Sequence, residues 1–364
     1  MNNNKNLWIL GPKDKKFSGI GLYSLNLLKG LNDKGYEDDI INIPFKSRTI
    51  LRYLYQFIYL PFYLLLFSHR YQNVILYEEA YSFLIPFCDL CRKKSILIFH
   101  HVPEGNSGDS VIEKLKYIYM RMILSLTTSA KKIVFPSEFS RAEYLKVFPM
   151  GRTNIKNRYI VIPNSFDFPA EIINSNDRVI ENEKDNLSFL YVGSEEARKN
   201  VNTAVEALTK LDVKPKIKFT KIGKAIVTEN RKKLSSILLH SSLDYQLFDF
   251  VNKEELEHYL STCDFFIMPS LHEGFGRTPI EAQHYGKLVI SSDIPVLREI
   301  MGDSAIYVQQ PNLVSSWVNV LQEVIQLDIE TLQIYKNKAK KNSARYTIEN
   351  VTDRFIANVL REEE

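Results

Sequence analysis

Two glutamates with seven residues between them lie where an apolar run gives way to a glycine-containing loop. Glu273 follows the run Phe265–Met268. Its loop contains Gly274 and Gly276, and Glu281 belongs to the next expected helix. In doubly wound sheets ligands bind at the carboxyl ends of strands, glycine lets the backbone approach a ligand closely, and the start of a helix favours an anion. The segment therefore predicts a site for a phosphate-bearing ligand.

The position of Glu281 also has a purely structural interpretation. Thr278, Pro279 and Glu281 match a capping box, with threonine as the cap, proline as the first helical residue and glutamate as the third. The local pattern favours neither role over the other. Glu273 has no helix to cap, so a structural role explains it less well.

Arg198 and Lys199 are adjacent cations just beyond another expected strand, Leu187–Val192. Taken alone, such a pair is most often a pair of solvated surface charges. At this edge of a sheet, however, cations can stabilise a leaving group that gains negative charge as a bond breaks.

Titratable residues also follow two expected strands of the N-terminal half, as the pairs Glu78–Glu79 and His100–His101. The glutamates are placed to contact hydroxyl groups of a ligand, although solvated charges are the favoured interpretation. Taken alone, the histidines are interpreted as structural or surface groups. Cys88 and Cys91 have a CxxC spacing, but Cys263 is alone, so packed thiols are favoured over a zinc or redox site.

These residues must be held by a regular alternation of strands and helices. Short apolar runs are typical of strands buried in parallel sheets, and two successive series predict two doubly wound α/β domains. The expected strands are Leu7–Leu10, Asp39–Ile43, Val74–Tyr77, Ser95–Phe99, Lys132–Phe135 and Tyr159–Ile162, then Leu187–Val192, Lys216–Ile222, Phe265–Met268, Leu288–Ser291 and Ala305–Val308. The expected helices of the second half are Asn200–Leu211, Glu229–Ser241, Glu254–Ser261 and Pro279–Tyr285, followed by two or three between Asn312 and Arg361.

The predicted domain boundaries follow a change in composition. Ile172–Asn186 is rich in Asn, Asp, Glu and Lys, which is typical of an exposed connection. The predicted domains are therefore 1–170 and 187–340, with a linker at 171–186 and a C-terminal helix at 341–364.

Composition limits the class of protein. The chain has 364 residues, enough for about two domains. Its 47 Lys and Arg against 43 Asp and Glu give a net charge of +4, too small to indicate nucleic-acid binding. Three cysteines allow no disulfide framework, and the first apolar run, Leu7–Leu10, is too short for a signal peptide. The expected location is the reducing cytoplasm.

The stretch Ile50–Phe67 is unusually aromatic and apolar for a soluble domain, although Gln56 and Pro61 argue against a membrane span. Two interpretations are equally open. One is a helix on a membrane surface, with aromatic side chains among the headgroups and basic ones on anionic lipid; the other is a helix buried against the N-terminal sheet. The basic residues around the stretch are Lys46, Arg48, Arg52, His69 and Arg70.

Several motifs resemble, in the same order, those of retaining glycosyltransferases with the GT-B fold, especially glycosyltransferase family 4 (glycosyl transferases group 1). The specific matches lie in the C-terminal half, where Glu273 and Glu281 resemble the family's glutamate-x7-glutamate motif. The other matching segments are Ser18–Tyr23, Phe135–Ser140, Ile162–Asp167 and Tyr191–Asn200.

The resemblance implies two Rossmann-like domains facing a cleft, with C-terminal helices that cross back to the N-terminal domain. It implies transfer of a hexose from a nucleotide-diphosphate sugar to a glycan or lipid-linked saccharide, with retention of anomeric configuration. The N-terminal domain would bind the acceptor. No metal or other cofactor is expected, and the Asp-x-Asp motif of the other glycosyltransferase fold is absent from the sequence.

For the C-terminal residues, the resemblance implies that Glu281 binds the nucleotide ribose and that Glu273 lies near the donor sugar. The backbone of Gly274, Phe275 and Gly276 would contact sugar hydroxyls or phosphate.

The resemblance also implies that Arg198 and Lys199 stabilise the leaving diphosphate and that His100 lies near the reacting centre. The N-terminal glycine loop, with Gly19 and Gly21, would contribute to donor binding.

Two residues depart from the family pattern: Ser194 stands where many relatives have arginine, and His101 where aspartate is frequent. Two other functions are therefore open. A sugar-nucleotide epimerase shares the fold but needs acid/base carboxylates, and a non-catalytic subunit could bind a glycan or a partner.

Overall fold

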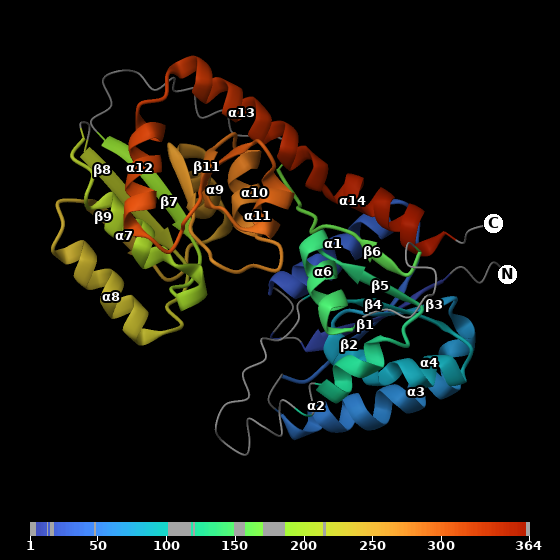
Figure 1. Ribbon diagram of the computed structural model, residues 1–364. Coiled ribbons are helices and arrows are strands. Elements are labelled where there is room, and N and C mark those ends of the chain that lie inside the picture. Colours follow the sequence, from blue (N-terminus) through green and yellow to red (C-terminus); the bar gives the residue numbers. More distant parts are fainter. Residues whose placement is uncertain are drawn as a thin grey trace. The chain divides into compact units, whose positions relative to one another are not determined.

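The computed structural model of the protein describes residues 5–12, 14, 18–46, 49–100, 118, 121–148, 157–169, 186–213 and 216–361. These residues form two compact units (Figure 1). The first combines the chain up to Asp167 with the C-terminal segment from Tyr346, and the second is Phe168–Arg345. Each unit is built around a six-stranded parallel sheet. The predicted fold class of two parallel-sheet α/β domains is confirmed.

The sheet of the first unit has the strand order β2-β1-β3-β4-β5-β6. Its central strands are buried along almost their whole length, as expected for a sheet covered by helices on both faces. The strands are β1 (Leu7–Pro12), β2 (Asp39–Ile43), β3 (Asn73–Leu76), β4 (Lys94–Ile98), β5 (Lys132–Phe135) and β6 (Tyr159–Val161). The helices are α1 (Gly19–Asp33), α2 (Ile50–Leu54), α3 (Leu60–Phe67), α4 (Ile85–Leu90), α6 (Glu138–Val147) and α14 (Ile348–Phe355).

The sheet of the second unit has the order β12-β11-β10-β7-β8-β9. Because β7 and β10 are neighbours and parallel, the loops that follow them leave the sheet side by side. The strands are β7 (Asn186–Val192), β8 (Lys216–Ile222), β9 (Asp244–Phe248), β10 (Phe265–Met268), β11 (Leu288–Ser292) and β12 (Ala305–Val308). The helices are α7 (Val201–Leu208), α8 (Thr228–Leu239), α9 (Lys253–Thr262), α10 (Arg277–His284), α11 (Pro295–Met301), α12 (Val314–Ile325) and α13 (Ile329–Ser343).

Most predicted elements are present, and five strands (β2, β5, β8, β10 and β12) have the predicted bounds. In the second unit, strand β9 and helix α11 were not predicted. β9 lies at the edge of its sheet with its side chains half-exposed, so its sequence carries no continuous apolar run. α11 is a short helix that begins at a proline after a turn.

The C-terminal helix belongs to the first unit, as the sequence predicts. α13 ends at Ser343 in the second unit, so the predicted boundary at 341 falls inside that helix. α14 packs on α1, where Gly30 leaves room for it: a Cβ at this position would lie 2.0 Å from Thr352 Oγ1. Lys34 and Asp353 add an ion pair of 2.7 Å between the two helices. Residues 171–185 of the predicted linker lie outside the described residues.

Candidate active site

Three of the predicted residues come together in the second unit, at the carboxyl ends of β7 and β10. Lys199 Nζ lies 2.6 Å from Glu273 Oε1, and Arg198 Nη1 lies 3.8 Å from Glu273 Oε2. The Glu273 side chain is 9% exposed, against 19% for Lys199 and 42% for Arg198. A nearly buried carboxylate is therefore flanked by two cations that reach solvent, which suits an anionic ligand.

Hydrogen bonds fix the turn that carries the two cations. The backbone N–H of Leu271, two residues before Glu273, donates to Arg198 O at 2.8 Å and ties the loop after β10 to the loop after β7. On the other side of the turn, Asn200 adopts a left-handed backbone with φ +52°, and its Nδ2 donates to Pro311 O at 2.7 Å. The cations therefore project from a turn that is held at both ends.

A buried ionic cluster lies directly behind this turn, and sequence reasoning missed it. Glu195 Oε1 lies 2.5 Å from Lys221 Nζ and 2.7 Å from Arg231 Nε, and the side chains of Glu195 and Lys221 are fully buried. Arg231 also pairs with Asp249 at 2.5 Å. Burial lowers the pKa of Lys221, and the Glu195 carboxylate opposes that shift. The available signal was Lys221 inside the strand Lys216–Ile222. A lysine buried in a strand needs a carboxylate partner.

Glu196 connects Ser194 to Arg198. Ser194 Oγ donates to Glu196 Oε2 at 2.8 Å, and Arg198 Nη2 donates to the same oxygen at 3.0 Å. The Arg198 guanidinium is thus shared between Glu196 and Glu273. The serine that departs from the family pattern has a definite role in this arrangement, because it orients the carboxylate that holds Arg198.

Glu281 is not part of a capping box, so that prediction is wrong. Helix α10 begins at Arg277, and its N-cap is Gly276, which has no side chain to accept a hydrogen bond. Gly276 has φ +91°, and a Cβ there would lie 2.8 Å from Leu297 Cδ2, so only glycine fits this position. The N-cap of α10 is therefore Gly276, two residues before Thr278. Glu281 instead faces Arg277 at 3.7 Å. Burial raises the pKa of Glu281, and Arg277 opposes the rise.

The loop before α10 is anchored by one side chain. Phe275 is buried, as is Gly276, whereas Gly274 is half-exposed. The loop therefore presents backbone at Gly274, next to the Glu273 carboxylate.

In the first unit, His100 lies at the carboxyl end of β4. Its side chain is almost buried: Nε2 donates to Tyr77 O at 3.0 Å, and the ring meets Tyr23 edge-on at 5.3 Å. Because a carbonyl only accepts, this bond fixes the tautomer with a proton on Nε2. His101 lies outside the described residues.

Glu78 and Glu79 are 7% and 5% exposed, so the favoured interpretation as solvated charges is wrong. Glu79 Oε2 accepts a hydrogen bond from His100 N at 3.2 Å, which links the ends of β3 and β4. A carboxylate can be buried here because it accepts a backbone donor at the edge of the sheet.

The N-terminal glycine loop leads into α1. Ser18 caps this helix by accepting a hydrogen bond from Gly21 N at 3.2 Å. Gly21 is buried and Gly19 is exposed. β1 and β3 are neighbours, so α1 begins at the same sheet edge as Glu78 and His100.

Within the part of the chain that the structure describes, no group of three or more His, Cys, Asp or Glu could hold a metal ion. Cys88 is buried, and burial raises its pKa to about 12. Cys91 Sγ donates to Leu64 O at 3.7 Å. The two cysteines are packed thiols.

The aromatic stretch forms a continuous helical segment, Ile50–Arg70. Among the described residues it is the one helix whose length and composition would allow it to cross a membrane. One face lies in the core of the first unit: Gln56, Leu60 and Leu64 are at most 3% exposed. The interpretation as a helix buried against the N-terminal sheet therefore fails for the opposite face, which is exposed. That face includes Ile50, Leu51, Tyr53, Leu54, Phe57, Ile58, Tyr59, Phe62, Leu65 and Leu66, each 40% exposed or more.

Residues 173–342 match the family model described as Glycosyl transferases group 1. The O-antigen chain mannosyltransferase RfbU of Salmonella typhimurium is 27% identical over 75% of this chain and 70% of that protein. The O-antigen chain mannosyltransferase B of Escherichia coli is 26% identical over 72% of this chain and 69% of that protein.

Two solved structures resemble the whole chain. Anabaena Alr3699/HepE in complex with UDP has a TM-score of 0.71 and 15% identity, covering 97% of this chain and 98% of that one. The OtsA apo structure has a TM-score of 0.70 and 12% identity, covering 99% and 100%. Both have the same two-domain α/β fold.

Proposed function

We propose that this chain, a glycosyltransferase whose residues 173–342 match the family model of the glycosyl transferases group 1, is a retaining, metal-independent hexosyltransferase. It moves a hexose from a nucleotide-diphosphate sugar to a glycan or lipid-linked saccharide. The observation that carries the proposal is the group formed by Glu273, Lys199 and Arg198 at the carboxyl ends of β7 and β10. The relatives and structures named above are not described as epimerases or as non-catalytic subunits.

The two cations would stabilise the departing diphosphate. As the glycosidic bond breaks, the diphosphate gains negative charge, and fixed cations in a partly buried site stabilise it without reorganising. In the free protein Glu273 holds Lys199 in position at 2.6 Å. Departure of the diphosphate leads, and the acceptor hydroxyl attacks from the same face, so no covalent nucleophile is required. The N–H groups at the start of α10 add positive potential.

The two glutamates would bind hydroxyl groups of the donor. Glu281 has no capping role and lies one turn inside α10. A carboxylate accepts two hydroxyl hydrogen bonds, which suits the ribose diol. Glu273, beside the half-exposed backbone of Gly274, would contact the donor sugar.

The acceptor would bind the first unit, and His100 is the residue of that unit to which the resemblance assigns a part in the reaction. The bond from His100 Nε2 to Tyr77 O fixes the ring. The printed names of the two relatives specify mannose and O-antigen chains, so mannose is the first hexose to test and a polysaccharide precursor the first acceptor.

The test is a transfer assay with the full chain and a panel of nucleotide-diphosphate hexoses. We expect nucleotide release that depends on acceptor, a product with the anomeric configuration of the donor, and full activity in a chelator. Inversion, or loss of activity in chelator that magnesium or manganese restores, would contradict the mechanism. A change of the sugar without acceptor would indicate an epimerase.

We further propose that the protein attaches peripherally to an anionic membrane through the exposed face of Ile50–Phe67, on the cytoplasmic side. Soluble proteins rarely expose an apolar patch of this extent. The charges around it complement anionic lipid: residues 40–77 contain one Lys and three Arg but no Asp or Glu. The helix lies on the bilayer rather than across it, because Leu60 and Leu64 are in the core of the first unit.

The polarity of this helix supports the proposal. Gln56 is buried, and Arg52 is half-buried and close enough to Tyr81 to oppose the rise in its pKa that burial causes. Two polar side chains thus lie on the inward side of the helix beside the buried Leu60 and Leu64, while the outward side is apolar, unlike the polar outer side of a helix on a soluble protein. Lipid-linked acceptors would meet the enzyme at this surface.

Co-sedimentation with vesicles tests the attachment. The protein should bind phosphatidylcholine vesicles that contain phosphatidylglycerol, and added salt should weaken binding but not abolish it, because only the electrostatic part is screened. The double variant Phe62→Ser/Leu66→Ser should bind much less, whereas Leu239→Ser, an equally exposed leucine of α8, should bind normally. Equal binding of both variants would contradict the proposal.

A further inference from the structure

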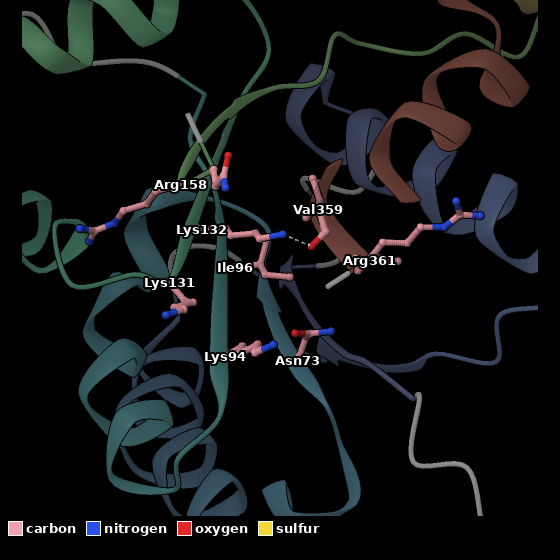
Figure 2. Close-up of a pocket in the computed structure, with 10 residues that line it drawn as sticks. Asn73, Lys94, Ile96, Lys131, Lys132, Arg158, Val359 and Arg361 are labelled. Carbon is pink, nitrogen blue, oxygen red and sulfur yellow. Dashed lines mark hydrogen bonds between the residues drawn. The ribbon is translucent and has the colours of Figure 1, made fainter. Parts of the chain in front are cut away.

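The amino edge of the first sheet carries a concentration of positive charge that the proposed reaction does not use. A hollow of about 450 Å³ opens where β3, β4 and β5 begin and the C-terminal helix ends (Figure 2). Five cationic side chains line it, contributed by four separate segments: Lys94, Lys131, Lys132, Arg158 and Arg361. A smaller neighbouring hollow of about 310 Å³ adds Arg141 and Arg354. Among the described lining residues of both, none is acidic.

Backbone carbonyl groups accept hydrogen bonds from two of these cations. Lys132 Nζ donates to Asn358 O at 3.1 Å and to Val359 O at 2.8 Å, and the second bond is drawn in Figure 2. Arg158 Nε donates to Ala130 O at 2.9 Å. These hydrogen bonds help to fix the positions of two cations that line the hollow.

The hollow lies at the opposite edge of the first sheet from His100 and Glu79. β4 begins at Lys94, which lines the hollow, and His100 follows its other end. At about 3.3 Å per residue, the two ends of this strand region are roughly 20 Å apart. A ligand at the amino edge would therefore not touch His100 or Glu79.

We propose that this amino edge binds a ligand that carries two or more phosphate charges. In Figure 2 the charged ends of Arg158 and Arg361 spread away from the centre of the hollow, so the surface fits an extended ligand better than a single enclosed ion. The ligand is either a soluble phosphate compound or a phospholipid headgroup. Arginine and lysine together supply both bidentate and point-charge contacts to phosphate.

Residue-resolved lysine acetylation tests the site in the full chain. Inorganic pyrophosphate should slow modification of Lys131 and Lys94 in a saturable manner. Lys146, an exposed lysine of α6 in the same unit, is the internal control and should react at an unchanged rate. This readout separates the site from any pyrophosphate bound near Lys199. Equal effects on Lys131 and Lys146, or no effect on either by pyrophosphate or by the vesicles described next, would overturn the proposal.

A second experiment decides whether the ligand is a soluble phosphate compound or a phospholipid headgroup. Phosphatidylcholine vesicles with phosphatidic acid should protect the same lysines if the ligand is a headgroup, whereas pyrophosphate alone should protect them if it is soluble. In the variant Arg361→Ser, half-saturation of Lys131 protection should need about tenfold more of the effective ligand, because one charged contact is lost. Unchanged half-saturation in this variant would also overturn the proposal.

Discussion

The second unit contains two carboxylates that each meet two cations, and they differ mainly in depth. Glu195, with Lys221 and Arg231, has a fully buried side chain. Glu273 has a side chain that is 9% exposed, and its cations Lys199 and Arg198 are 19% and 42% exposed, against 0% for Lys221 and 21% for Arg231. The same chemical pairing therefore occurs once where a ligand cannot enter and once where it can.

This difference separates a positioning role from a chemical one. A buried carboxylate and cation stabilise each other only as long as both are present, because either one alone is an unpaired charge in a low-dielectric interior. Lys199 and Arg198 both reach solvent, so a phosphate can approach them while Glu273 stays paired. Glu195 stabilises the loop, and Glu273 positions Lys199 and Arg198.

The largest effect is expected from removing the buried carboxylate. Glu195→Gln should lower the free energy of unfolding of the second unit by about 3–5 kcal/mol, because Lys221 and Arg231 lose their compensating charge. Urea unfolding would be followed by Trp317 fluorescence in a Trp8→Phe background, since the chain has two tryptophans, one in each unit.

The matched control is Glu206→Ala on α7, whose carboxylate is 40% exposed and pairs with Lys210 at the surface. It should change stability by less than about 0.5 kcal/mol. Equal losses in the two variants would remove the distinction between the two carboxylates.

The next effect is on turnover. Lys199→Ala should lower kcat by about 100- to 1000-fold, because the lost charge acts on negative charge that develops in the transition state. Folding stability should change little. Transfer assays on this variant and on Lys210→Ala, an exposed lysine of the same unit, would be compared. Near-normal kcat in Lys199→Ala would place the leaving-group contact elsewhere.

Sequence reasoning located Arg198, Lys199 and Glu273, the residues proposed to act on the donor, better than it located the buried cluster around Glu195. The apolar runs that form β7 and β10 are recognisable in the sequence, and Arg198, Lys199 and Glu273 each follow such a run. Their meeting depends on β7 and β10 being neighbours, although the residues are 74 positions apart, and no local pattern contains that information.

Glu195 was missed because a buried ion pair leaves no periodic pattern in the sequence. The capping-box interpretation of Thr278–Glu281 is wrong because it, too, considered only local residues. Thr278 and Pro279 suit a helix start, but Gly276 can adopt φ +91° and begins the helix earlier. The tertiary contact with Leu297, invisible in the sequence, decides the outcome.

A smaller effect is expected from Arg198. Its side chain is 42% exposed, and its distance to Glu273 is 3.8 Å, so solvent weakens its field at the site. Arg198→Ala should lower kcat/KM by about fivefold, equivalent to about 1 kcal/mol. Glu196→Gln, which removes the partner that holds this guanidinium, should have a similar effect. A loss as large as that of Lys199→Ala would show that both cations act directly on the leaving group.

The smallest effect concerns a third pair, Glu281 and Arg277. The pH dependence of stability shows whether this pair behaves like the buried cluster around Glu195 or like the more exposed group around Glu273. Burial raises the pKa of Glu281 above its ordinary value of 4.5, so the folded protein keeps this proton to a higher pH than the unfolded chain does. The stability that the protonated carboxyl contributes is therefore present below pH 4.5 and is lost as pH rises through the raised pKa. Relative to Glu281→Gln, the wild-type protein should lose stability between pH 4.5 and neutrality in urea titrations followed by Trp317.

Parallel curves, or a wild type that gains stability with pH, would mean that Arg277 compensates the carboxylate as fully as Lys221 and Arg231 compensate Glu195. In that case Glu281 would be held as a structural ion pair and would be a poor partner for a ribose diol.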